Sequence, residues 1–258
     1  MPNASDLRHD RSRRTREETA ARATGRRHAE PWRCVRGLPA SGLAAAITAV
    51  TLCAAASAAP PVEEIVAGYN AGIRGAMDAV ESLTVEQSML EPVEGEEGNR
   101  ARAVLTYSRE GGMEREEIES SIGHPKGEYT LASLVGPELT ENEYAVTLAG
   151  VEEKDGRDCY RLEVTSLERD FRHFDGAVWV TVDGFNLVRV TGSVADPPFP
   201  VVRVELDKAF EPGPCGLWLL RRHTGEVEVQ LGFIKRRGMI HIFYDNYSVS
   251  IAPEARSE

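Results

Sequence analysis

The sequence predicts a mainly β protein with some α structure, in which one N-terminal amphipathic helix covers a curved antiparallel sheet of about eleven strands. Apolar residues recur every three or four positions over residues 62–83. From Thr84 onward they recur at every second position instead, which is the period of a half-buried strand. Turn pairs that contain glycine separate the alternating runs, as in a meander of hairpins.

The first 58 residues have the composition of an export signal. Ten arginines stand against five acids there, and the stretch from Gly42 to Ala56 carries no charge. Ala56-Ser57-Ala58 then offers the small residues that signal peptidase reads. Roughly 15 apolar residues are fewer than the about 20 that span a bilayer. We therefore expect a leader at 1–58, one domain at 59–258 and a periplasmic location, with a retained membrane anchor as the alternative.

The predicted mature chain is strongly acidic. The whole sequence has 30 Lys+Arg and 41 Asp+Glu residues. The leader holds 10 and 5 of them, which leaves a formal charge of about −16 on the remainder. A field of this sign repels nucleic acid and anionic membrane surfaces, so we expect no nucleic-acid partner.

The helix is predicted just after the leader. Pro61 suits its first position, and Glu63 and Glu64 lie in its first turn, where the helix dipole favours acids. A helix with so continuous an apolar stripe needs a large apolar surface to lie against. The stripe consists of Val62, Ile65, Val66, Tyr69, Ile73, Met77, Val80 and Leu83.

The candidate strands follow in a regular rhythm that only the run 123–143 breaks, and that run is predicted as a loop with a short helical turn. The strands are expected near 84–90, 101–109, 113–121, 144–151, 158–166, 177–183, 187–194, 200–210, 217–223, 226–234 and 239–250. The expected turns are Gly111-Gly112, Asp155-Gly156, Asp175-Gly176, Asp183-Gly184, Thr224-Gly225 and Arg237-Gly238.

One face of these strands is apolar and the other is charged. A helix covers a strip about 10 Å wide, whereas eleven strands about 4.8 Å apart would make a flat sheet about 50 Å across. The sheet must therefore curl, and a curled sheet that one helix only partly fills leaves a cavity. The residues predicted to line this cavity are Tyr144, Val146, Leu148, Leu162, Val164, Val178, Val180, Val182, Val202, Val204, Leu206, Val229, Leu231 and Phe233.

The sequence lacks the common catalytic and metal-binding patterns. It contains no G-x-S-x-G, H-E-x-x-H or C-x-x-C. We expect no enzymatic activity, no cofactor and no metal site. An acidic run could be imagined as a calcium site, but it lacks the D-x-D-x-D-G spacing and is better explained as a solvated face. This run comprises Glu114, Glu116, Glu117 and Glu119.

Two cysteines and two tryptophans of the mature chain admit alternatives. The strands of Cys159 and Cys215 would lie about 19 Å apart, whereas a disulfide needs Cα atoms about 4.4–6.8 Å apart, so we expect free thiols. Trp179 and Trp218 fall on the outer face. They either pack under flanking loops, which we favour, or dock on an envelope partner, as in an assembly module without bound lipid.

Three segments resemble the outer-membrane lipoprotein-sorting (LolA/LolB-like) superfamily, and the resemblance covers roughly residues 62 to 250. The segments are Leu83-Thr-Val-Glu-Gln, Val151-Glu-Glu-Lys-Asp-Gly-Arg-Asp-Cys-Tyr-Arg-Leu-Glu and Val178-Trp-Val-Thr-Val-Asp-Gly-Phe-Asn-Leu-Val-Arg-Val. Thr181 departs from the family pattern, which often has Asp after Trp-Val.

This resemblance implies a curved antiparallel half-barrel whose hydrophobic interior accepts the acyl chains of lipids or lipoproteins. Envelope membrane proteins are the further partners that it implies, and we expect the chain to be a monomer. The resemblance also implies an arginine near an early strand that gates the cavity. Arg100, Arg102 and Arg109 are the candidates.

The leader gives the first testable prediction. The exported chain should begin at or near Ala59 and be recovered from the periplasmic fraction, because the small residues at 56 and 58 define the cleavage site. The intact mass of the exported form measures this directly. A cytosolic pool that keeps the arginine-rich segment would contradict the predicted location.

Overall fold

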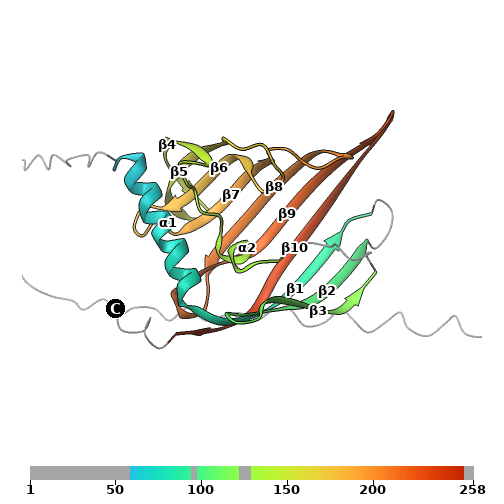
Figure 1. Ribbon diagram of the computed structural model, residues 1–258, viewed down its shortest axis with the longest axis horizontal. Helices are drawn as coiled ribbons and strands as arrows, with labels where there is room; N and C mark the ends of the chain where they lie inside the picture. Colours follow the sequence, from blue (N-terminus) through green and yellow to red (C-terminus); the bar gives the residue numbers. More distant parts are fainter. Residues whose placement is uncertain (1–58, 94–97, 122–128, 253–258) are drawn as a thin grey trace, which may run out of the picture. The chain divides into compact units, whose positions relative to one another are not determined.

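The computed structural model describes residues 59–93, 98–121 and 129–252, so the predicted leader lies outside the described residues. Ten strands form one antiparallel sheet, and the helices α1 and α2 lie against it (Figure 1). The elements are α1 Val62–Ala79, β1 Val80–Glu91, β2 Asn99–Ser108, β3 Gly112–Ser120, α2 Leu131–Val135, β4 Tyr144–Lys154, β5 Arg157–Ser166, β6 Phe174–Thr181, β7 Leu187–Val194, β8 Val201–Pro212, the 3₁₀ turn η1 Pro214–Gly216, β9 Trp218–Leu231 and β10 Ile234–Ile251.

The strand order is β3-β2-β1-β10-β9-β8-β7-β6-β5-β4. Each strand lies beside its neighbour in the chain, except that β3 and β4 are far apart and the meander β1–β3 joins the rest of the sheet through the pairing of β1 with β10. As described, the sheet remains open, with β3 and β4 at its edges. The predicted fold class is therefore confirmed, with ten strands in place of about eleven. None of the described helices combines the length and apolarity that crossing a bilayer requires.

Three of the predicted turns lie inside strands, and one of them, Thr224-Gly225, accounts for the lower strand count. Gly225 pairs with Leu206 and Ile240 in the middle of β9, so this one strand spans two of the predicted ones. Asp175-Gly176 lies within β6, and Arg237-Gly238 lies within β10. The turn between β9 and β10 is Gly232-Phe233, where the positive φ of Gly232 suits a two-residue hairpin.

The N-terminal helix ends earlier than its apolar stripe predicts. Val80 is extended and begins β1 directly, so Val80 and Leu83 are buried as strand residues. Pro61 is the N-cap and not the first helical residue. The helical part of the stripe packs as predicted, because Ile65 and Tyr69 are almost completely buried against the sheet.

The outer face has a small apolar cluster of its own. Trp179 and Cys159 are buried there, and the Lys154 ammonium lies 4.3 Å from the ring centroid of Trp179. Trp218 is half-buried between this cluster and the main core, with the Arg157 guanidinium 4.8 Å from its ring. The tryptophans thus pack within the fold, although basic side chains of β4 and β5 cover them in place of loops. Cys159 and Cys215 are both free, as predicted.

Backbone hydrogen bonds set the concave side chains in rows that run across the strands. One row reads Leu148, Leu162, Val178, Val190, Lys208, His223, Ile242, Met89 and Ala101 from β4 to β2. The next row reads Val146, Val164, Gly176, Gly192, Leu206, Gly225 and Ile240 from β4 to β10. The second row therefore has no side chain at three of its seven positions.

Gly176 and Gly192 form a pair at which β6 and β7 approach closely. A Cβ on Gly176 would lie 2.0 Å from the carbonyl oxygen of Thr191, and a Cβ on Gly192 would lie 2.2 Å from that of Asp175. Backbone atoms cannot yield as the end of a side chain can. Only glycine fits here, and the pair allows the sheet to bend.

We predict that Gly176→Ala lowers the free energy of unfolding by about 2–3 kcal/mol, because the new methyl group overlaps backbone. Gly238→Ala is the matched strand control, since a Cβ there would meet nothing within 4 Å. Urea denaturation measures both. Equal stabilities for the two variants would contradict the close approach of β6 and β7.

A polar clamp holds α1 to the segment that follows α2. The Asn70 side-chain amide donates to the carbonyl of Leu139 at 2.8 Å, and its oxygen accepts from the Leu139 N–H at 2.8 Å. The Tyr69 hydroxyl donates to the carbonyl of Pro137. Burial raises the pKa of Tyr69 far above its usual range, so this hydroxyl keeps its proton. These contacts make α1 and residues 131–139 one cover.

Asn70→Ala should cost about 2–3 kcal/mol of folding free energy, because it leaves the buried N–H and carbonyl of Leu139 without partners. Arg74→Ala is the control from the same helix. Its ion pair with Glu138 is exposed and should contribute at most about 1 kcal/mol. Thermal and urea unfolding of the two variants test the difference, and a similar loss in both would refute the clamp.

Candidate functional site

The predicted cavity residues divide into three groups. Those beside the helices are buried core: Tyr144, Leu162, Val164, Val178 and Val180. Those farther along the concave face are half-buried: Val146, Leu148, Val204, Leu206 and Val229. The remaining four are exposed: Val182, Val202, Leu231 and Phe233.

These four residues are exposed for identifiable reasons. Val182 follows the end of β6, and Val202 lies in a bulge of β8, so neither continues the inward row. Leu231 is the last residue of β9. Phe233 is in the hairpin turn and is 99% exposed. The structure therefore does not bring them together with the buried set.

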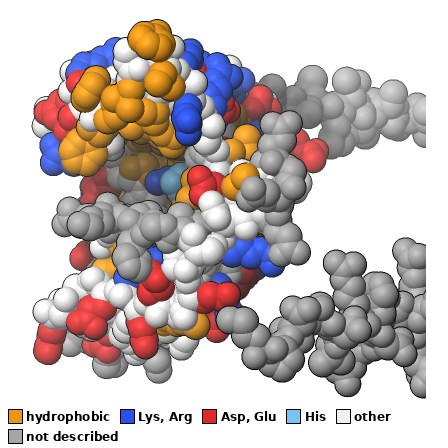
Figure 2. Space-filling view, turned by 90° about the vertical axis from the view of Figure 1, so that its right-hand side faces the viewer, with side chains coloured by type: hydrophobic (Ala, Val, Ile, Leu, Met, Phe, Trp, Pro, Cys, Tyr) orange, Lys and Arg blue, Asp and Glu red, His pale blue; other side chains and the backbone are white. Residues whose placement is uncertain are grey.

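Three of the half-buried residues, on β8 and β9, line a groove that we call the concave groove: the inner face of β8, β9 and β10 beyond α1 and α2. Val146 and Leu148 lie instead on β4 at the edge of the sheet. The space-filling view shows a hollow below a hydrophobic rim, with a basic and a histidine side chain inside it (Figure 2). Val204, Leu206 and Val229 are half-buried there, and among the described residues no helix covers them as α1 and α2 cover the core. The face continues to the exposed Leu231 and Ile234.

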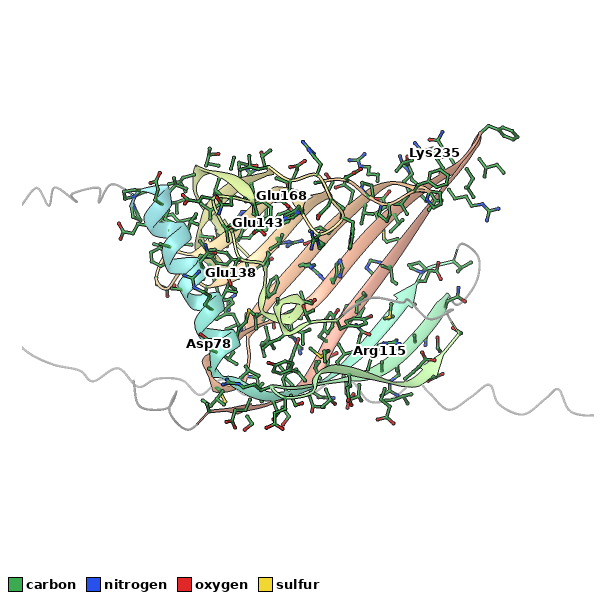
Figure 3. The ribbon with its side chains drawn as sticks, in the orientation of Figure 1. Asp78, Arg115, Glu138, Glu143, Glu168 and Lys235 are labelled. Atoms are coloured by element: carbon green, nitrogen blue, oxygen red, sulfur yellow. The ribbon has the colours of Figure 1, made fainter. Side chains whose placement is uncertain are left out.

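The groove runs toward the end of the β9–β10 hairpin, which projects away from α1. Lys235, beside the turn, lies far from Asp78 near the end of α1 (Figure 3). Phe199, in the turn before β8, lies near this end because the Gln230 N–H donates to the carbonyl of Pro200, and it is 86% exposed. This hairpin end is therefore an apolar tip with basic neighbours.

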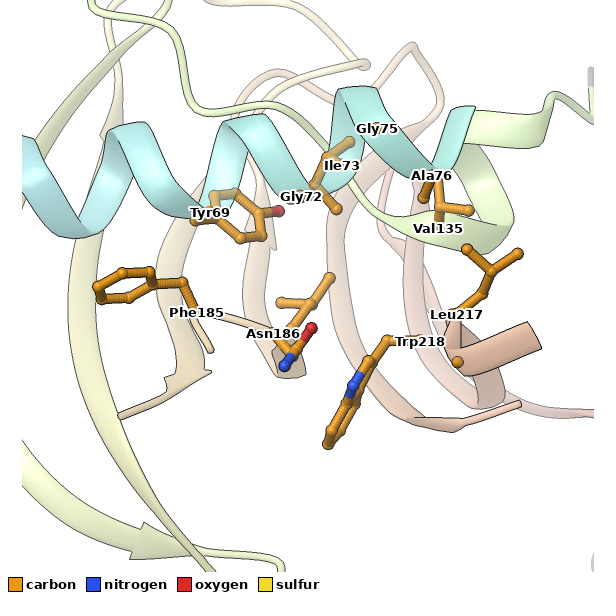
Figure 4. Close-up of a pocket in the computed structure, with 12 residues that line it drawn as sticks. Tyr69, Gly72, Ile73, Gly75, Ala76, Val135, Phe185, Asn186, Leu217 and Trp218 are labelled. Atoms are coloured by element: carbon orange, nitrogen blue, oxygen red, sulfur yellow. The ribbon is translucent and has the colours of Figure 1, made fainter. Parts of the chain in front are cut away.

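A smaller cavity of about 130 Å³ lies under the cover (Figure 4). Tyr69 and Ile73 of α1 face Leu217 and Trp218 across it, and Val135 of α2 forms part of its wall. It is smaller than the about 300–1,000 Å³ of ordinary ligand pockets. Its presence shows that α1 does not fill the curve of the sheet completely even where the helix packs on it.

The concave groove contains two half-buried polar residues that the sequence analysis missed, and the exposed Arg236 faces the same side as the partner of Val229. Lys208 on β8 and His223 on β9 are register partners, and each has an apolar partner on its other side, Val190 and Ile242. The sequence did indicate that Lys208 points inward, because Lys208 continues the alternation of Val204 and Leu206. Burial lowers the pKa of Lys208. It also lowers the pKa of His223 to about 4, with the Lys208 charge as a second cause.

The three candidate gating arginines do not face the groove. Arg100 and Arg102 are exposed, and Arg102 alternates with the inward Ala101 and Ala103. Arg109 donates to the carbonyl of Asp78 at the end of α1. The inward arginine of this region is Arg115 on β3, the partner of the buried Leu105.

Within the described ranges, one group of side chains has the spacing of metal ligands. It consists of Glu168, Asp170 and His173. Asp170 already accepts from the Arg172 Nε and Nη2 at 2.9 and 2.7 Å and lies 2.6 Å from His173 Nδ1. The Arg172 guanidinium holds the pKa of Asp170 far below its usual range. These contacts join residues of the loop between β5 and β6, so the group is explained by its role in stabilising this loop.

No family model matches the sequence, and no curated protein matches it. Solved structures do. A LolA superfamily protein from Nitrosomonas europaea has a TM-score of 0.43 at 12% identity over 76% of this chain and 96% of its own. A DUF1329 family protein from Desulfovibrio piger has a TM-score of 0.42 at 16% identity over 75% and 97%. A putative outer membrane lipoprotein-sorting protein domain from Vibrio parahaemolyticus has 0.42 at 12% identity over 72% and 91%.

All three have TM-scores below 0.5 and identities of at most 16% to this chain.

Proposed function

We propose that the protein is a periplasmic carrier that holds acyl chains of lipids or lipoproteins in the concave groove. One observation carries this proposal: the apolar inner face of β8–β10 extends beyond its helical cover and remains half-exposed in the described chain. A soluble domain normally buries such a face, so an apolar ligand is the simplest partner for it. Residues 1–58 are, on this proposal, the cleaved export leader. The role is binding without catalysis.

The energetics suit reversible carriage. Burial of each acyl methylene contributes about 0.8 kcal/mol, so eight buried carbons give about 6 kcal/mol before the costs of ordering the ligand. The groove residues are mainly branched aliphatic side chains of medium size, as Val204 and Leu206 illustrate. The absence of Cβ atoms at Gly192 and Gly225 leaves further room in the neighbouring row.

A second candidate is an envelope docking module without bound lipid. The apolar tip favours it, because Phe199 and Phe233 are 86% and 99% exposed and belong to no core. Lipid extraction from protein purified out of its own host separates the two functions. A carrier should release acyl lipid, and a docking module should release none.

The carrier proposal predicts different effects for two positions that the sequence treats alike. Val204→Trp should fill the groove, leave the protein folded and weaken uptake of an uncharged fluorescent acyl ester by tenfold or more. Val180→Glu should prevent folding, because Val180 is fully buried in the core and the new charge has no partner. Circular dichroism and probe titration measure the two effects.

Val202→Trp is the control for the first variant. Val202 is on the same strand but lies in the bulge and is 46% exposed, so uptake should not change. If the wild-type protein takes up no acyl ester, the carrier proposal fails and the docking module becomes the better explanation.

A further inference from the structure

Lys208 places an amine in surroundings that otherwise suit a hydrocarbon chain. Its row across the sheet has seven apolar residues, and His223 is the other polar member. A lysine can usually extend its stem and place its amine in water. Lys208 starts from the middle of the concave face, two residues beyond Leu206, and its surroundings desolvate the amine.

No described residue neutralises this amine. The nearest acid in the chain is Asp207, but neighbouring strand residues point to opposite faces, and Asp207 pairs with Arg189 on the outer face at 2.5 Å. No hydrogen bond or ion pair to Lys208 occurs among the described residues, and burial is the sole cause of its shifted pKa. Lys208 is half-buried. Holding a proton on an unpaired amine in such surroundings is costly, and a bound anion would relieve that cost.

His223 adds a directed hydrogen-bond donor beside the charge. It is the register partner of Lys208 on β9, which places the two Cβ atoms about 5 Å apart. Its low pKa keeps the imidazole neutral at pH 7, so one ring nitrogen carries a proton to donate. A Cβ on Gly225 would lie 3.9 Å from His223 Nε2, and its absence leaves space at this nitrogen.

We infer that Lys208 and His223 form an anion subsite within the concave groove, and that its ligand is a single-chain amphiphile with a carboxylate head, a long-chain fatty acid. One ammonium and one neutral donor match the single charge and two oxygens of a carboxylate. The apolar positions beside them, including Leu206 and Ile242, would contact the chain. This inference rests on the proposed carrier function and specifies its ligand class.

The test uses one fluorescent chain with two heads: 11-(dansylamino)undecanoic acid and its methyl ester, titrated at pH 7.5 into the exported form of the protein. The wild type should bind the acid at least tenfold more tightly than the ester, the size expected of a charge-assisted hydrogen bond. Lys208→Met should bind both alike while its affinity for the ester stays within about threefold of wild type. Lys208→Arg should keep the preference for the acid.

Lys154→Met is the matched control, because Lys154 lies on the outer face above Trp179 and its loss should leave the preference unchanged. A folded Lys208→Met protein that still prefers the acid overturns the subsite. So does a wild type that binds the ester but shows no preference, and in that case the carrier function stands. Failure of both probes to bind refutes the two proposals together. Tighter binding of a monoacyl phosphate than of the carboxylate would overturn the assigned head.

Discussion

The packing of α1 into the curve of the sheet is the interaction on which the rest of the structure depends. Ten strands present one apolar face, and one helix of 18 residues with a five-residue helix beside it provides the described cover. Ile65 and Tyr69 fix the depth of the helix, and Asn70 fixes its position relative to residues 136–139. The core forms where this cover reaches, and the concave groove begins where it ends.

The bending of the sheet follows from the same requirement. A flat sheet could touch the helix along only a few strands, whereas a curled one brings β1, β4 and β6 to a common core. Gly176 and Gly192 make that bend possible on the inner face by removing side chains where two backbones converge. The same two glycines therefore leave the second row of concave side chains loosely packed and allow the bend that buries the first row.

Much of this fold could be predicted from period and turn chemistry, because burial on one face imposes alternation. Helix α1, most of the strands and the buried set around Val178 and Val180 follow from it. The continuity of β9 could not be predicted, since a Thr-Gly pair occurs both in turns and within strands. Gly225 is distinguished only by Ile240 across the strand. The bulge at Val202 and the turn at Phe233 likewise depend on pairing partners distant in the chain.

An open sheet also carries a liability at its two edges, where unpaired backbone groups can recruit a second chain. Strand β3 bears Glu114, Glu116 and Glu119 as exposed side chains along nine residues. Strand β4 at the other edge is interrupted by an irregularity between Leu148 and Gly150. Like charges and bulges are two ways in which natural sheets discourage edge-to-edge growth. The acidic run that first suggested an ion site therefore makes sense as protection against aggregation, which a half-barrel needs and a closed barrel does not.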